Sequence, residues 1–307
     1  WLGASWSIYA PYITPDKPRT PIVIAQADVY NSKGKKISRI ITDNSWKTHS
    51  SPNKLLGTWE FGNYGGEIYD GNKEIEGWNT IGFDDSSWDQ AIEYAPKLTL
   101  SAPKMETNKL FEEINPVSIE ERADGTYRVD MGVNFAGWTQ INVSGEPGTL
   151  IDFLYSEREQ DEMTFRNHSA YIIGPSGKGT FHHRFNYASG RWITIKGMKT
   201  KPQLSDIKGW QVRTAFESAS TFESSDPLQN WIYDRVNWTF RNLSIGGYIV
   251  DCPQRERFGY GGDAHATSET GMFNYKMGSF YTKWLEDWRD VQGTEPMVGD
   301  MNNPEWA

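Results

Sequence analysis

The spacing of hydrophobic residues divides this chain into a long part with strand-like alternation and a shorter part with helical periodicity. From about residue 21 to residue 222, short apolar runs are separated by turn residues, which predicts strands. From residue 226 onward, apolar residues recur every three or four positions, which predicts helices. We therefore expect a multidomain chain in the order β, β, then α, without an internal repeat.

The first β region, residues 1–97, predicts a hairpin in its first half. Residues 22–29 read as one strand, residues 31–34 as a turn and residues 37–42 as the returning strand. Residues 1–20 are short and interrupted by prolines. We therefore expect an incomplete start to this domain.

The second β region, residues 98–209, has short strands and frequent turns, which is typical of a β-sandwich. A turn is expected at residues 188–190, a linker at residues 198–209, and extended chain at residues 210–222. The strands are expected at residues 126–131, 139–143, 151–155, 181–185 and 191–195.

The third region, residues 210–307, contains the helices. Asp226 is a capping acid, and Pro227 suits the first helical turn because that position needs no hydrogen-bond donor, so a helix is expected from there to residue 244. A second helix is expected at residues 264–274. A third is indicated by apolar residues at helical spacing: Phe280, Trp284, Leu285, Trp288 and Val291. We expect the stripe of Phe280, Trp284 and Trp288 to be helix core rather than a sugar platform.

Composition excludes several classes of protein. The mean hydropathy is -0.66, and no run approaches the ~18 apolar residues of a membrane helix. The net charge of -9 and the lack of a basic patch argue against a nucleic-acid partner. A single cysteine, Cys252, excludes an internal disulfide and a multi-cysteine metal site. We expect no cofactor; calcium is compatible with the composition, but no motif indicates it.

Fourteen tryptophans and 15 tyrosines favour a carbohydrate ligand, because aromatic faces stack on sugars, although most are expected in the core. His182 and His183 are adjacent on an expected strand, so only one can face a given site, and no third metal ligand follows at a known spacing. Asn167-His168-Ser169 is one of four glycosylation-type triplets, which arise easily by chance.

Residues 251–263 are the densest group of chemically active side chains, with three carboxylates, two arginines and three glycines. Proline and glycine predict a loop, where catalytic groups are common. Arg255 and Arg257 flank Glu256 but point in different directions, so only one need pair with it. Nearby acids would raise one pKa and favour a general acid. An ion-pair network that only fixes the loop would have the same composition, so residue chemistry alone leaves both interpretations open.

This motif resembles the signature of the bacterial and fungal α-L-rhamnosidases of glycoside hydrolase family 78. Other landmarks of that family follow in order along the chain, at residues 77–88, 130–138, 185–192 and 220–227. The resemblance implies a galactose-binding-like N-terminal β-sandwich, a central β-sandwich and the start of an (α/α)6 barrel. It also implies inverting hydrolysis of terminal α-L-rhamnose from glycosides or polysaccharides, in a secreted or periplasmic setting.

The resemblance assigns a role to each residue of the motif. Glu256 corresponds to the general acid, although many members have Arg-Asp-Glu-Arg where this chain has Arg255-Glu256-Arg257. Tyr260 stands where many members place tryptophan against the sugar ring. Residues that correspond to hydroxyl-binding or pocket positions are Asp251, Arg255, Asp263 and Trp306.

The general base of the family is a glutamate late in the barrel, and about three of its twelve helices are expected here. Glu295 and Glu305 follow the motif, but nothing assigns either to this role. Three helices cannot close a barrel, so we expect exposed apolar surface that takes the rest of the barrel or a second copy of the chain. The alternatives are a non-catalytic carbohydrate-binding fragment and an (α/α)6 polysaccharide lyase.

Overall fold

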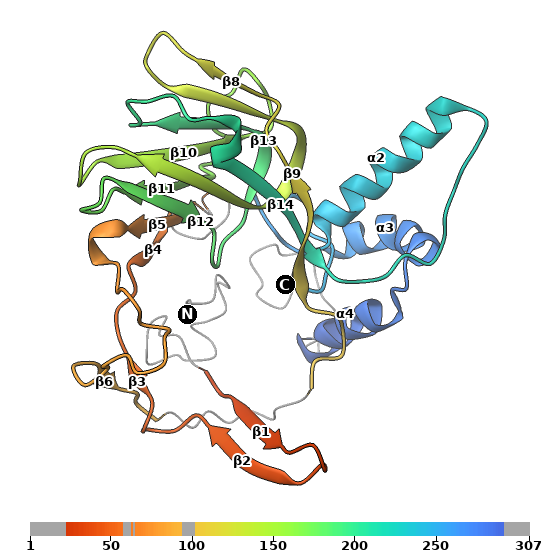
Figure 1. Ribbon diagram of the computed structural model, residues 1–307. Coiled ribbons are helices and arrows are strands. Elements are labelled where there is room, and N and C mark those ends of the chain that lie inside the picture. The colour runs from red at the N-terminus through yellow and green to blue at the C-terminus, as the bar shows by residue number, and fades with distance from the viewer. Residues whose placement is uncertain (1–22, 58–62, 64, 94–101, 292–307) are drawn as a thin grey trace. The chain divides into compact units, whose positions relative to one another are not determined.

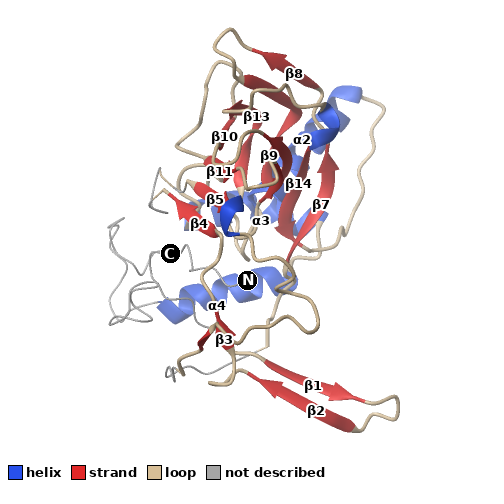
Figure 2. Ribbon diagram, turned by 60° about the vertical axis from the view of Figure 1, so that its left-hand side comes forward, coloured by secondary structure: helices blue, strands red, loops and turns tan. Residues whose placement is uncertain are grey.

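The computed structural model describes residues 23–57, 63, 65–93 and 102–291 (Figures 1 and 2). The chain divides into two compact units. Trp1–Asn53 and Lys73–Ser101 form the first, and Lys54–Asn72 and Ala102–Ala307 form the second.

The first unit contains short antiparallel strand pairs. β1 (Gln26–Tyr30) and β2 (Lys36–Ile41) form the expected hairpin, and β3 (Lys47–Thr48) pairs with β6 (Asp89–Gln90). The hairpin turn is fixed locally, because the side-chain oxygen of Asn31 accepts hydrogen bonds from two backbone amides within the next four residues, each at 3.0 Å. None of these four strands buries a side chain.

The second unit begins inside the region that the sequence groups with the first domain. β4 (Asn53–Leu56) and β5 (Gly66–Asp70), followed by the short helix η1 (Gly71–Lys73), join the large sheet, where β5 pairs in parallel with β11 (His168–Ile172). The sequence predicts one domain up to residue 97, whereas Lys54–Asn72 belong to the second unit. Their place depends on strand pairing across about 100 residues, which leaves no local signal in the sequence.

The large sheet has ten strands in the order β4-β5-β11-β10-β13-β9-β14-β7, and β8 and β12 also pair with β9. Its core contains mainly aliphatic and aromatic side chains from facing strands. The remaining strands are β7 (Asn108–Ile114), β8 (Ser118–Glu121), β9 (Tyr127–Ser144), β10 (Leu150–Ser156), β12 (Lys178–His182), β13 (Ala188–Lys196) and β14 (Ile207–Thr214).

β9 is one strand of 18 residues, where the sequence predicts two. Its first half pairs with β8 and β13, and its second half pairs with β12 and β14. Because the neighbours change along β9, the sheet curls, as Figure 1 shows. β13 has a bulge between Gly190 and Trp192, which locally increases bending.

Two segments expected as connections are strand instead. Residues 188–190 begin β13 and pair with β9, and the small, buried Gly190 leaves room for the backbone of Ser156 on β10. Within the expected linker, η2 (Leu204–Asp206) leads directly into β14, whose first residue, Ile207, is fully buried against the sheet core.

In the described part of the chain, three helices follow the sheet: α2 (Pro227–Leu243), α3 (Gly261–Asn274) and α4 (Gly278–Val291). The predicted start of α2 is confirmed, since the Asp226 carboxylate accepts a hydrogen bond from the Leu228 amide at 2.8 Å. Phe280 and Trp284 of α4 are buried in the core of the helical region, as expected. None of the helices in the described ranges is long and apolar enough to span a membrane.

The sheet and the helices are joined by specific bonds. The indole of Trp238 on α2 donates to the carbonyl of Asn134 on β9 at 2.8 Å, and the side-chain oxygen of Asn242 accepts from the Ala136 amide at 2.8 Å. These bonds fix the start of the helical region against the long strand, which positions the loop that follows α2.

Candidate active site

The acid-rich motif forms a closed loop that ends where α3 begins. The Asp251 amide donates to the Phe258 carbonyl at 2.9 Å, and the Phe258 amide donates to the Asp251 carboxylate at 3.0 Å. Asp263 lies in the first turn of α3, where the helix dipole favours a negative charge. The expected loop is therefore confirmed, with its last residues in a helix.

Glu256 is held by two side chains of the same motif. The Tyr260 hydroxyl donates to one carboxylate oxygen at 2.7 Å, and the Arg255 guanidinium contacts the other. The Glu256 side chain is only 13% exposed, whereas that of Arg255 is 42% exposed. The carboxylate is thus enclosed, while its cationic partner remains accessible from solvent.

The crowding of negative charges expected from the sequence affects the pKa of Asp263. Burial raises the pKa of its carboxyl group above the ordinary value, and the negative charges of Asp251 and Glu256 raise it further. The negative charges of Asp251 and Glu256 therefore act on the Asp263 carboxyl group.

The two arginines of the motif point in different directions, as the sequence predicts. Arg255 contacts Glu256, whereas Arg257 is buried, and its guanidinium reaches Asn186 and Asn167 of the β-sheet domain. The motif is therefore tied to the sheet as well as to the helices.

Sequence reasoning missed the contribution of the sheet to this site. The side-chain amide of Asn167 donates to the Gln254 carbonyl at 2.8 Å, and that of Gln254 donates to the Glu157 carboxylate at 3.2 Å. Asn167 belongs to a glycosylation-type triplet, a pattern that arises easily by chance. Its position as a polar residue beside a strand is the only feature of the sequence that could have indicated its role.

Of the two adjacent histidines, His183 has a structural role. Its ring is buried, its Nδ1 accepts from the Thr139 amide at 3.0 Å, and its Nε2 lies 3.3 Å from the Ser169 hydroxyl. Burial lowers its pKa to about 4. This neutral ring is part of the hydrogen-bonded sheet core.

Asp251, Cys252 and Glu256 bring three potential metal-ligating atoms within 4.8 Å of one another. The Cys252 thiol donates to Asp251 at 2.8 Å, and burial raises its pKa to about 11. A thiol that keeps its proton is a poor ligand, and calcium prefers oxygen. The donor set therefore does not suit calcium.

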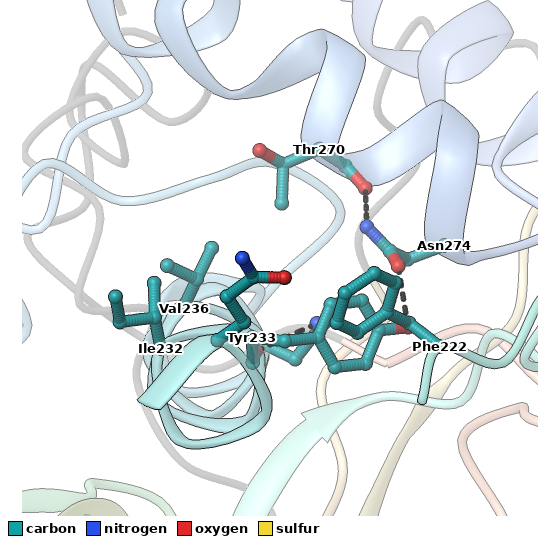
Figure 3. A pocket seen from close by; sticks show the side chains of 8 residues that line it. Phe222, Ile232, Tyr233, Val236, Thr270 and Asn274 are labelled. Carbon is teal, nitrogen blue, oxygen red and sulfur yellow. Dashed lines mark hydrogen bonds between the residues drawn. The ribbon is translucent and has the colours of Figure 1, made fainter. Parts of the chain in front are cut away.

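A separate hollow lies between α2 and α3 (Figure 3). Tyr233 donates to Asn274 at 2.7 Å beside the rings and aliphatic groups of Phe222, Ile232 and Val236. No carboxylate lines it, so it offers no general acid. The acids are in the motif loop, while Trp306, Glu295 and Glu305 lie outside the described residues.

A curled β-sheet domain that leads into α-helices, with an acid- and arginine-rich loop where the helices meet, has the organisation of a glycoside hydrolase with a helical catalytic domain. The sequence matches three domains of one such family in order. These are the alpha-L-rhamnosidase N-terminal domain at residues 13–112, the bacterial alpha-L-rhamnosidase concanavalin-like domain at residues 120–213, and the bacterial alpha-L-rhamnosidase 6 hairpin glycosidase domain at residues 217–306. The chain belongs to the bacterial α-L-rhamnosidase family, which confirms the resemblance seen in the sequence.

Individual relatives agree with this assignment. An alpha-L-rhamnosidase of Formosa agariphila is 34% identical over 283 residues, which cover 87% of this chain and 29% of the relative. The structure of an α-L-rhamnosidase from Dictyoglumus thermophilum matches with a TM-score of 0.82 at 34% identity, over 94% of this chain and 33% of its own. A Streptomyces avermitilis α-L-rhamnosidase, solved in complex with L-rhamnose, matches with a TM-score of 0.82 at 25% identity. The match covers 99% of this chain and 30% of the Streptomyces chain.

The chain thus spans about a third of the length of these relatives. The likenesses favour neither a binding-only fragment nor a polysaccharide lyase.

Proposed function

We propose that this protein hydrolyses terminal α-L-rhamnosides, with Glu256 as the general acid that protonates the leaving oxygen. The observation that supports this role best is the enclosed Glu256 carboxylate, held between the Tyr260 hydroxyl and the Arg255 guanidinium on a loop beside two further acids. The Streptomyces relative, solved with L-rhamnose, supports rhamnose as the sugar.

The neighbours of Glu256 would bind the sugar. Asp251, Arg255 and Asp263 carry the charged and hydrogen-bonding groups that recognise hydroxyls, and the Tyr260 ring would lie against the sugar. Trp306 is proposed as a further pocket aromatic on the strength of the family resemblance alone. Carboxylate and guanidinium groups make strong, directional hydrogen bonds, so they would fix the anomeric carbon near Glu256.

We propose inversion at the anomeric carbon. An inverting glycosidase needs a second carboxylate ~6.5–9.5 Å from the acid to activate water. Asp251 and Asp263 belong to the same loop and helix start as Glu256 and are assigned to the sugar. The base is therefore expected from the 6 hairpin domain beyond the described residues.

The apolar side of α2 and α3 supports contact with further protein. Phe222, Ile232 and Val236 line the hollow of Figure 3 and expose large apolar side chains. We propose that this side packs against further helices of the 6 hairpin domain, with a second copy of the chain as the alternative. A secreted or periplasmic location and a reaction without a cofactor are proposed from the substrate class.

The first test is hydrolysis of p-nitrophenyl α-L-rhamnopyranoside by the product of the whole coding region and by the 307-residue chain. Glu256→Gln should lower kcat at least about 100-fold and retain L-rhamnose binding, because the amide keeps the shape of the side chain but cannot donate the proton. Glu286→Gln is the matched control, since Glu286 lies on α4 and pairs with Lys104.

Each outcome of this test has a separate meaning. Unchanged turnover in Glu256→Gln would overturn the assignment of the acid. Turnover by the 307-residue chain alone would require a base within it and would direct mutagenesis to Glu295 and Glu305. No turnover by either protein would overturn the proposed substrate.

A further inference from the structure

Arg257 is the charged residue of the motif that the proposed chemistry does not use. It is 3% exposed, and its guanidinium donates to the Asn186 side chain at 2.6 Å, to the Tyr187 carbonyl at 2.9 Å and to the Asn167 side chain at 3.2 Å. Its Nε donates to the Pro253 carbonyl at 2.7 Å. The guanidinium carbon lies 3.8 Å from the centroid of the Tyr187 ring. One side chain therefore bonds both the loop and the sheet domain.

The acceptors of Arg257 lie in two connections of the large sheet. Asn167 immediately precedes β11, and Asn186 and Tyr187 immediately precede β13. The Asn167 side chain also donates to the Gln254 carbonyl at 2.8 Å, so it holds a second point of the same loop. The loop is thus attached to two segments that the sheet itself fixes.

The sheet-side acceptors are themselves organised by a buried carboxylate. Glu67 on β5 is fully buried and accepts hydrogen bonds from the amides of Phe185 at 2.7 Å and Asn186 at 2.6 Å. It also accepts from the Arg184 amide at 3.1 Å. A continuous series of bonds therefore runs from β5 through this connection to Arg257.

The backbone at Arg257 adopts a conformation that needs such support. Its φ is +61°, in the left-handed region that non-glycine residues rarely occupy. Its amide donates to the Cys252 carbonyl at 3.1 Å, and its carbonyl accepts from the Tyr248 hydroxyl at 3.2 Å. Such conformations persist where the surroundings determine them, and they cluster at functional sites. The turn at Arg257 lets its side chain enter the sheet domain while Glu256 stays with Arg255 and Tyr260.

We propose that Arg257 is a positioning residue that fastens the motif loop to the β-sheet domain and so holds Glu256 at the glycosidic oxygen. The attachment of the loop rests on the hydrogen bonds described above, and the effect on catalysis rests on the proposed function. The planar guanidinium bonds two asparagines and a carbonyl at once, which a lysine ammonium cannot match in geometry.

The reactivity of the Cys252 thiol shows whether the loop is attached, and measuring it does not require an active enzyme. Cys252 lies inside the loop, where its sulfur accepts from the Glu256 amide at 3.4 Å and its thiol donates to Asp251 at 2.8 Å. Burial raises its pKa to about 11, so little thiolate forms near neutral pH. A loosened loop would expose the thiol and return its pKa toward ~8.5.

The structural test measures the reaction of the 307-residue chain with Ellman's reagent at pH 7.5. Arg257→Met should react at least about 10-fold faster, because each pKa unit regained gives about ten times more thiolate. Asn167→Ala removes only part of the attachment and should give a smaller increase. Arg213→Met is the control, since Arg213 is also buried and stacks on Phe111 at 3.6 Å, outside the loop.

Circular dichroism shows whether each variant is folded. If Arg257→Met does not fold, the thiol reactivity of Asn167→Ala tests the attachment of the loop instead. A rate equal to wild type in the folded variants, or an equal increase in Arg213→Met, would overturn the attachment.

The catalytic test uses the product of the whole coding region. Arg257→Met should lower kcat for p-nitrophenyl α-L-rhamnopyranoside about 100-fold with less than about 3-fold change in KM, because a small displacement of the acid affects the transition state more than sugar binding. Arg257→Lys should fail to restore kcat. Wild-type kcat in Arg257→Met would overturn the positioning role and leave the proposed function intact. An inactive wild-type protein would overturn the proposed function, while the thiol assay would still decide the attachment.

Discussion

His183 predicts a loss of stability when the pH falls from 7.5 to 5. The ring is 1% exposed, and its Nδ1 accepts a hydrogen bond from the Thr139 amide, so a proton on this nitrogen would remove the bond. Burial lowers the pKa from 6.5 to about 4 in the folded protein. The unfolded chain exposes the imidazole and binds the proton at a higher pH.

The size of the effect follows from this difference in pKa. Between about pH 6.5 and pH 4 the unfolded state binds more protons, so the stability is fully present above about pH 7 and is lost as the pH falls. At pH 5 the two proton-binding equilibria differ by about 30-fold, which corresponds to about 2 kcal/mol. For a unit of this size, that lowers Tm by about 4 to 8 °C.

Differential scanning calorimetry on the wild-type chain and on His183→Gln between pH 7.5 and pH 5 measures this effect. The glutamine oxygen can accept from the Thr139 amide, but the side chain has no titrating proton. Between pH 7.5 and pH 5, the wild-type Tm should fall about 4 to 8 °C further than the variant Tm. An identical pH dependence in both proteins would refute the reasoning.

Two further predictions concern the start of α2 and the motif loop. Asp226→Ala removes the cap of α2 and should cost about 1 kcal/mol in urea unfolding, whereas Asp226→Asn should keep most of that stability; equal losses would contradict the cap. Gly259→Ala should cost about 1 to 3 kcal/mol, because the added carbon would lie 2.8 Å from the Tyr248 ring. Gly262→Ala is its control, since nothing lies within 4 Å of the added carbon there, and a loss as large as that of Gly259→Ala would rule out the close contact as the cause.

The local features of this fold are predictable from the sequence. The turn after β1 depends on Asn31 and its near neighbours, and the start of α2 depends on Asp226 and Pro227. The apolar stripe of α4 follows from a spacing of three and four residues, and Phe280 and Trp284 are buried accordingly. Each of these signals lies within a few residues, where hydrogen bonds and side-chain spacing act directly.

Much of the candidate site is also predictable from the sequence. The composition of the motif indicates an acid-rich loop, and the positions of Arg255 and Arg257 beside Glu256 indicate that only one arginine need contact it. The resemblance to family 78 adds the proposed identity of the acid. The distribution of charge was harder to predict, because the raised pKa of Asp263 depends on how deeply the folded chain buries it.

The tertiary structure alone decided how the motif is attached. β5 leaves the first region to pair with β11, and its buried Glu67 organises the connection that receives Arg257. The continuous strand β9 likewise depends on partners before and after it in the chain. Strand pairing and buried polar bonds join residues far apart in sequence, and no local pattern specifies which pairs will meet. The acid-rich motif can therefore be picked out from the sequence, whereas its attachment to the sheet follows only from the fold.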